Sequence, residues 1–200
     1  MIAILLMAVA PPPPAASSQL KPIIMAEDYP RSAMDAGEEG PVAFEALIAP
    51  DGSVDKCTVI VSSRYADLDA ATCKIIQTRA RFSPAEDASG KPIYGIYRSV
   101  ITWSLGNVAS GSLDPQLELN INQAPPGVKL PVVMTLNYRT RPDGTATDCK
   151  LADKSAGEPA ALADVACNSV LSQPPEIITN SKGQPVTAQN NMVVRFSLGR

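Results

Sequence analysis

The sequence contains no histidine among its 200 residues. Histidine is the commonest general base and a frequent metal ligand, so its absence excludes serine–histidine and cysteine–histidine nucleophile pairs. No Cys-x-x-Cys motif occurs, which argues against a zinc knuckle and a thioredoxin-type redox site. We therefore expect no enzyme, no cofactor and no metal.

Aromatic residues make up only 4% of the chain, so the core must consist mainly of aliphatic side chains. The net charge is -3, from 17 basic and 20 acidic residues, and no run of one sign stands out. Nucleic-acid binding requires a basic surface, and docking to anionic lipid requires a basic segment. We expect neither partner.

A short apolar run, Ile2 to Ala10, opens the chain and is followed by four prolines, Pro11 to Pro14. A membrane-spanning helix needs roughly 20 apolar residues, so this run is too short to span. Residues 1–18 fit a secretory signal peptide, although no basic residue precedes the apolar run. We expect a periplasmic or secreted protein; an inner-membrane anchor is the alternative if the start lies upstream.

Five landmarks occur twice in the same order, with nearly the same gaps. They are a Pro-Asp-Gly turn, a cysteine five residues after its glycine, a Leu-x4-Cys helical run, a Gly-x-Pro turn, and an aromatic residue followed by Ser-Leu-Gly. The two sets begin at Pro50 and Pro142. Such a repeat indicates one structural unit used twice. We predict units at residues 28–106 and 117–200, joined by a linker at residues 107–114.

Each unit is predicted to have α+β structure, with a small antiparallel sheet and one helix on a single face. The expected strands are 41–49, 54–62 and 96–104 in the first unit, and 129–139, 146–152 and 191–198 in the second. The predicted buried helix faces are Leu68, Ala71, Ile75 and Ile76, and Leu162, Val165, Ala166 and Val170. Asp67 is available to cap the first helix.

The four cysteines allow three pairings, and the repeat selects one of them. In each unit one cysteine lies in the strand after the turn, and the other lies about 140° around the helix from the leucine. A strand cysteine and a cysteine at the edge of the helix core face can be bridged. We predict the disulfides Cys57–Cys73 and Cys149–Cys167.

The first unit resembles the C-terminal domain of the TonB family. It carries the family pattern in order: Tyr29-Pro30-x-x-Ala33, Gly40-x-Val42, Asp51-Gly52, Ser62-Ser63, Leu68-Asp69 and Arg81-Phe82-x-Pro84. The second unit keeps the turn and the helix but lacks the Tyr-Pro motif, and Gln173-Pro174-Pro175 stands near the place of Arg-Phe-x-Pro. It therefore resembles a diverged copy.

This resemblance implies a periplasmic module that binds the plug segment of outer-membrane transporters by adding a strand to its sheet. The expected acceptor is the last strand of the first unit, as an open edge formed by Ile96, Tyr97, Arg98, Ser99, Val100 and Ile101. The alternatives are that this strand belongs to the sheet core, and that the protein is an exported structural or interaction protein without energy coupling. The family's transducers have a membrane helix, a histidine and a long proline-rich spacer, which this sequence does not contain.

Overall fold

The computed structural model describes residues 24–105, 107–111, 113, 115–152, 160–174 and 176–199. The predicted signal segment, residues 1–18, lies outside them. The elements of the first half are η1 (Ala26–Asp28), α1 (Arg31–Ala36), β1 (Gly40–Ile48), β2 (Val54–Val61), α2 (Ala66–Arg79), β3 (Ala85–Glu86) and β4 (Pro92–Ser104). Those that follow are β5 (Asn107–Gly111), β6 (Leu117–Ile121), β7 (Val132–Thr140), β8 (Ala146–Leu151), α3 (Ala160–Leu171) and β9 (Ala188–Leu198).

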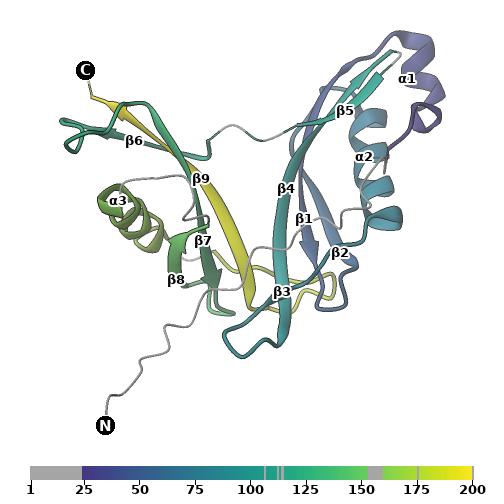
Figure 1. Ribbon diagram of the computed structural model, residues 1–200. Helices are drawn as coiled ribbons and strands as arrows, with labels where there is room; N and C mark the ends of the chain where they lie inside the picture. Colours follow the sequence, from purple (N-terminus) through teal and green to yellow (C-terminus); the bar gives the residue numbers. More distant parts are fainter. Residues whose placement is uncertain are drawn as a thin grey trace.

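The strands form one continuous sheet in the order β2-β1-β4-β9-β7-β8, shown in Figure 1. β3 and β5 pair with β4, and β6 pairs with β9. Most pairs are antiparallel, but β4–β9 and β6–β9 are parallel. The sheet is therefore mixed, which corrects the expectation of purely antiparallel sheets.

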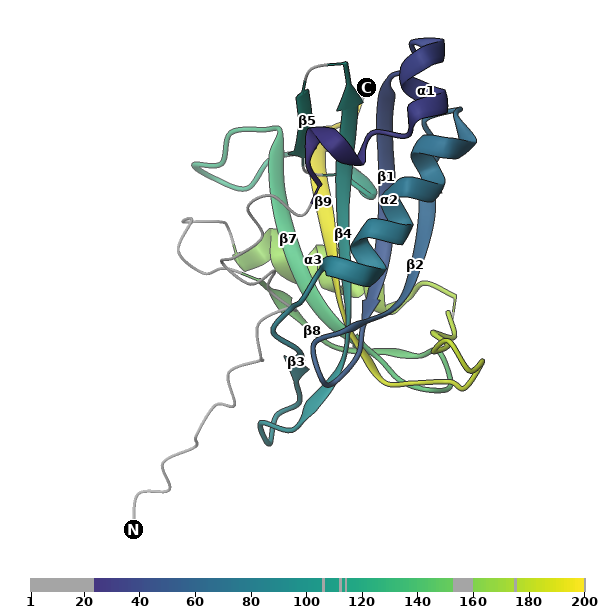
Figure 2. The same ribbon diagram turned by 90° about the vertical axis from the view of Figure 1, so that its right-hand side faces the viewer.

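The two halves of the sheet join where Tyr94 lies opposite Ala188 and Gly95 opposite Gln189. Beyond this short parallel contact β4 and β9 diverge toward the ends that carry β5 and β6 (Figure 1). Side chains along a strand point alternately to the two faces of the sheet. The partner register at the junction places even-numbered residues of β4 and of β9 on the same face. The β4 residues that pack under α2 are odd-numbered, whereas the β9 residues that pack under α3 are even-numbered. The two helices therefore cover opposite faces of the sheet (Figure 2).

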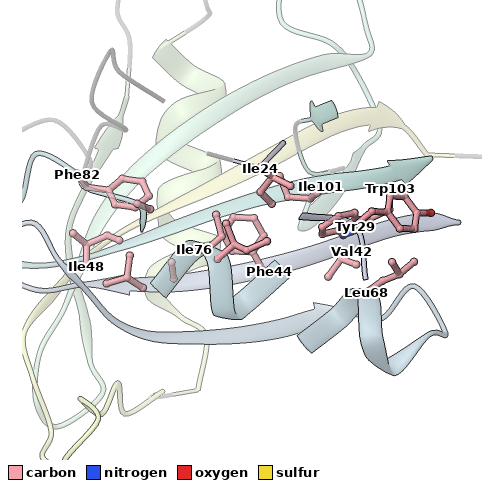
Figure 3. Packing of buried hydrophobic residues seen from close by; sticks show 14 of the residues in the cluster. Ile24, Tyr29, Val42, Phe44, Ile48, Leu68, Ile76, Phe82, Ile101 and Trp103 are labelled. Atoms are coloured by element: carbon pink, nitrogen blue, oxygen red, sulfur yellow. The ribbon is translucent and has the colours of Figure 1, made fainter. Parts of the chain in front are cut away.

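The first core lies between α2 and the strands β1, β2 and β4 (Figure 3). Trp103 is fully buried, makes an edge-on contact with the Tyr29 ring at 5.3 Å, and donates its indole N–H to Thr72 Oγ1 at 2.9 Å. Thr72 Oγ1 in turn donates to the Leu68 carbonyl, which leaves this buried polar pair satisfied. The predicted helix face is buried, with Ala71 only partly so.

The second core lies between α3 and the strands β6 to β9, around Met134, Leu136, Val194 and Phe196. Leu162, Ala166 and Val170 of α3 face it, as predicted. Val165 is 45% exposed instead, because the buried face follows an i, i+4, i+8 stripe that passes it.

A smaller third cluster closes the junction between the halves. Leu47, Ile96 and Ala188 are buried there, and Tyr94 and Ile178 pack against them. The loop between α3 and β9 thus reaches the first half, where the Ser181 amide and hydroxyl both donate to the Asp55 carboxylate at 2.7 Å. The two halves are held by a shared sheet, a small core and a polar contact.

Two local predictions are wrong. Residues 107–111, predicted as part of a linker, form strand β5 against the last five residues of β4. Asp67 does not cap α2: the N-cap is Tyr65, which has no side-chain capping hydrogen bond, and Asp67 accepts a hydrogen bond from Ser32.

Candidate functional site

Strand β4 was expected to be the open edge that accepts a partner, and this expectation is wrong. β4 lies inside the sheet, with β1 along one side and β9 and β5 on the other. Its continuous antiparallel pairing with β1 runs from Gly40–Trp103 to Ile48–Gly95. The sequence pattern could not reveal this, because β9 lies far along the chain and β5, which directly follows β4, carries no strand signal.

The side chains of the predicted binding residues are mostly engaged within the protein. Ile96 and Ile101 are buried, Tyr97 packs on Phe44 and Phe82, and Val100 lies opposite Gly111. The Ser99 hydroxyl donates to the Gly111 carbonyl at 3.0 Å. Contact of these residues with a partner stays a prediction.

Arg98 of the same group spans the point where β4 and β9 separate. Its Nε donates to Glu45 at 2.8 Å, and its Nη1 donates to the Asn191 carbonyl of β9 at 2.9 Å. The side chain therefore ties the second half to the first, which is a structural role.

The connecting strand β5 covers the end of β4 that a partner strand would use. Its residues Asn107-Val108-Ala109-Ser110-Gly111 pair with Ser104 back to Val100. Only Val108 of this strand packs against the first core, and residues 109–111 are exposed. Asn, Ala, Ser and Gly have low strand propensity, so the sequence carries no strand signal here.

The sheet ends on one side at β2 and on the other at β8. β8 carries Asp148 and Lys150, and Asp148 pairs with Arg139 of β7 at 2.9 Å. β2 has no charged residue after Lys56, and Ile60 and Val61 are 43% and 59% exposed. Charges of the kind that protect β8 from pairing with another strand are therefore missing from the end of β2.

The loop between β2 and α2 is held by Asp69. This carboxylate accepts hydrogen bonds from the Ser62 and Ser63 hydroxyls and from the Ser63 amide, at 2.5 to 3.0 Å. Burial opposes ionisation of Asp69, but these hydrogen bonds outweigh it and lower the pKa of the carboxyl. The network fixes Arg64 in a left-handed conformation with φ of 80°.

The Pro-Asp-Gly turns have the same hydrogen bonds in both halves. In each turn the aspartate carboxylate accepts from the amide and hydroxyl two residues later, in Asp51–Ser53 and in Asp143–Thr145. The turn glycine carbonyl then accepts a distant amide, from Phe82 to Gly52 and from Glu176 to Gly144. The hydrogen bonds from the hydroxyl and amide of Ser53 lower the pKa of Asp51, and those from Thr145 lower the pKa of Asp143.

The Gly-x-Pro turns match in the same way. The amide of Gly90 donates to the Asp87 carbonyl and that of Gly183 to the Asn180 carbonyl, both at about 2.9 to 3.0 Å. The side-chain oxygens of Asp87 and Asn180 each accept two backbone amides of their turn. The side chains of Asp87 and Asn180 therefore stabilise the same turn in the two halves.

Each half contains one disulfide, with the pairing that the spacing predicts. Cys57 of β2 is bonded to Cys73 of α2, with their Cα atoms 5.4 Å apart. Cys149 of β8 is bonded to Cys167 of α3, with their Cα atoms 5.5 Å apart. Each bond fixes an end strand of the sheet to the helix that covers it.

The described residues offer little for small-molecule chemistry. They contain no cluster of three or more acidic or cysteine side chains that could hold a metal ion. A polar pocket of about 130 Å³ lies beside β1 and β2, lined in part by Glu45, Lys56 and Glu176. Ligand pockets usually measure about 300–1,000 Å³, so this pocket is smaller than a typical small-molecule site.

Within the described part of the chain, none of the helices has the length and apolar character needed to cross a membrane. The apolar run Ile2 to Ala10 is outside that part.

Comparison with known proteins gives one match. No curated protein and no solved structure matches the chain. The profile of the Gram-negative bacterial TonB protein C-terminal family matches residues 25–105, which span η1 to the end of β4. Residues 25–105 are therefore similar to the TonB C-terminal domain, which suggests a TonB-like protein-interaction module.

Proposed function

We propose that this chain is an exported, non-enzymatic protein-binding module that takes up an extended segment of a protein partner. The observation that carries the proposal is the match of residues 25–105 to the TonB C-terminal family. The two disulfides support an oxidising compartment such as the periplasm. The partner we propose is the plug segment of an outer-membrane transporter.

We further propose that residues 117–200 are a second, diverged copy of the domain. Support comes from the matched turns, the matched strand-to-helix disulfides, and the common element order of β1-β2-α2-β4 and β7-β8-α3-β9. The same hydrogen bonds occur at two matched pairs of turns, which is consistent with duplication of one unit. The proposed domain limits are 28–106 and 117–200.

The proposed acceptor is the end of β4 from Val100 to Ser104, with β5 displaced. Strand addition uses backbone hydrogen bonds, so a partner segment with better strand propensity can replace the Asn-Val-Ala-Ser-Gly strand. β5 makes only a five-residue pairing and buries little apolar surface, and both features favour its release.

The test is a covalent link between β5 and β4. Thr102 and Ala109 lie opposite each other, so the double variant Thr102→Cys, Ala109→Cys can be joined by a disulfide. We expect the oxidised variant to lose binding of a synthetic transporter plug peptide, measured by calorimetry on the full chain. The double variant Thr102→Ser, Ala109→Ser is the matched control and should bind like the unmodified chain.

Equal binding by the linked variant and its serine control would rule out the β4 acceptor. A full chain that folds with both native disulfides but binds no plug peptide in any form would rule out the transporter role.

The second candidate is an exported interaction protein that keeps the fold without energy coupling. It is favoured by one observation, namely that β4 pairs with β1 on one side, and on the other side with β9 at Tyr94 and Gly95 and with β5 from Val100 to Ser104. In that case β4 is an interior strand of the sheet and does not accept a partner segment. The peptide measurement above separates the two candidates.

A further inference from the structure

We propose that the part of β4 covered by β5 selects a partner segment with two apolar side chains at alternate positions, one against Trp103 and one against Ile101. This inference rests on the proposed function and deepens it, because it states the side-chain pattern that the partner must carry. It follows from a comparison of β5, which pairs with the end of β4, and β6, which pairs with the end of β9.

The surface that β5 covers on the α2 side of the sheet is apolar. Side chains alternate along a strand, so every second residue of a segment paired with β4 points to this side. The β4 residues that point this way are Ile101 and Trp103, which are buried in the first core. Tyr29 lies edge-on to Trp103 with ring centroids 5.3 Å apart, and Figure 3 shows Ile24 close to Ile101. A segment paired here therefore meets apolar side chains at two positions that are two residues apart.

β5 fills only one of these two positions with an apolar side chain. Val108 lies opposite Trp103 and packs against the first core, whereas Ser110 lies opposite Ile101 and is exposed. Residues directly opposite each other in an antiparallel pair have Cβ atoms about 4.5–5.5 Å apart, so Ser110 places a small polar group beside Ile101. The second position is therefore occupied by a side chain that matches its surroundings poorly.

The second half has the same arrangement with both positions filled. Phe196 of β9 corresponds to Trp103 of β4, since each is followed by Ser-Leu-Gly. β6 places Leu119 opposite Phe196 and Leu117 opposite the buried Val194, and both leucines pack against the second core. β6 runs parallel to its partner strand and β5 antiparallel, but side chains alternate in the same way in both cases. Two apolar residues at alternate positions therefore suit this kind of surface, and β5 departs from that pattern at its second position.

A partner segment that supplies both apolar side chains gains a contact that β5 does not make. Burial of one aliphatic side chain in place of a serine beside Ile101 corresponds to about a tenfold gain in affinity. This gain partly offsets the advantage that β5 has as a segment of the same chain, which is its high effective concentration.

The experiment compares two synthetic peptides of about nine residues, built from threonine and serine, that differ only in the placement of two valines. In one peptide the valines are two positions apart, and in the other they are adjacent. Both peptides have the same composition, but only the first directs both valines to one face of the strand. Titration of the full, oxidised chain, followed by the fluorescence of its single tryptophan, Trp103, should show about tenfold tighter binding of the alternating peptide.

Two variants of the chain give an independent readout. Ser110→Val fills the position opposite Ile101, so β5 competes better and binding of the alternating peptide should weaken about tenfold. Ala109→Val is the matched control, because Ala109 lies opposite Thr102 on the other face of the sheet. It raises strand propensity without adding a contact to the core, so peptide binding should weaken by about threefold or less.

Equal binding of the two peptides would overturn the inference, as would equal effects of Ser110→Val and Ala109→Val, or a chain that binds neither peptide. The transporter role is judged separately by the plug peptide. If the alternating peptide binds and the plug peptide does not, the selectivity stands and the transporter partner is ruled out. If the plug peptide binds while the placement of the valines has no effect, only the selectivity is overturned.

Discussion

Gly52 lies in the first Pro-Asp-Gly turn with its backbone in the left-handed region, at φ of 82°. A Cβ at this position would lie 2.2 Å from the Phe82 carbonyl oxygen, and the Gly52 carbonyl accepts the Phe82 amide at 2.9 Å. The glycine is therefore required both by conformation and by close approach of the chain that follows α2. This contact joins the Pro-Asp-Gly turn to the Arg81-Phe82 segment that follows α2.

We predict that Gly52→Ala lowers the free energy of unfolding by about 3 kcal/mol or more, because strain and a backbone clash act together. Gly37→Ala is the control: Gly37 has φ of 67° but no atom within 4 Å of its added Cβ, so the loss should be about 1 kcal/mol. Urea unfolding followed by the fluorescence of the single, buried Trp103 measures both. Equal losses would show that the clash is relieved by movement of the Phe82 segment.

At the scale of elements, each helix is joined to an end strand of the sheet by a disulfide. The bridged residues are separated by 16 positions in the first half and by 18 in the second. End strands have only one neighbouring strand, so β2 and β8 gain most from a second attachment. The aliphatic cores are small, and the links offset their limited burial.

We predict that the double variant Cys57→Ala, Cys73→Ala lowers the free energy of unfolding by about 3 kcal/mol. The physical reason is the loop-closure entropy that the unfolded chain regains. Urea unfolding measures the change, and the matched pair Cys149→Ala, Cys167→Ala should give a loss of similar size in the second half. An unchanged midpoint in either variant would contradict the prediction.

For the whole molecule, the decisive feature is the junction at which β4 and β9 join the halves into one sheet. The parallel contact spans only Tyr94 and Gly95, so Arg98, the Ser181–Asp55 contact and the cluster around Ile96 carry much of the attachment. Cooperative unfolding of the two halves therefore depends on a small number of side chains.

We predict that Arg98→Gln separates the unfolding of the halves. Calorimetry should show a broadened or double transition, with a van 't Hoff enthalpy below the calorimetric one. Arg139→Gln is the control, because Arg139 pairs with Asp148 inside the second half and does not cross the junction. A single, sharp transition in both variants would show that the remaining contacts across the junction are enough to couple the halves.

The sequence was a good guide to local structure and a poor guide to how the units meet. The turns, the buried faces of α2 and the cysteine pairing follow from short-range spacing, since a helix or turn is formed by residues near one another in the chain. The interior position of β4 could not be predicted, because β9 lies more than 80 residues further along. The candidate site was therefore assigned to β4 with the wrong strand neighbours, and its contact with a partner stays a prediction.

The amino-acid pattern alone was enough to predict the pairing of the cysteines and the similarity of residues 25–105 to the TonB C-terminal domain. The union of the two halves into a single mixed sheet, with helices on opposite faces and β5 over the end of β4, became evident only in the folded molecule. The physical reason is that strands pair through backbone groups, which every residue except proline carries alike. Asn-Val-Ala-Ser-Gly pairs with β4 because the fold brings it there, and the outer edge of β2 stays open because β1 is the only described strand that pairs with β2.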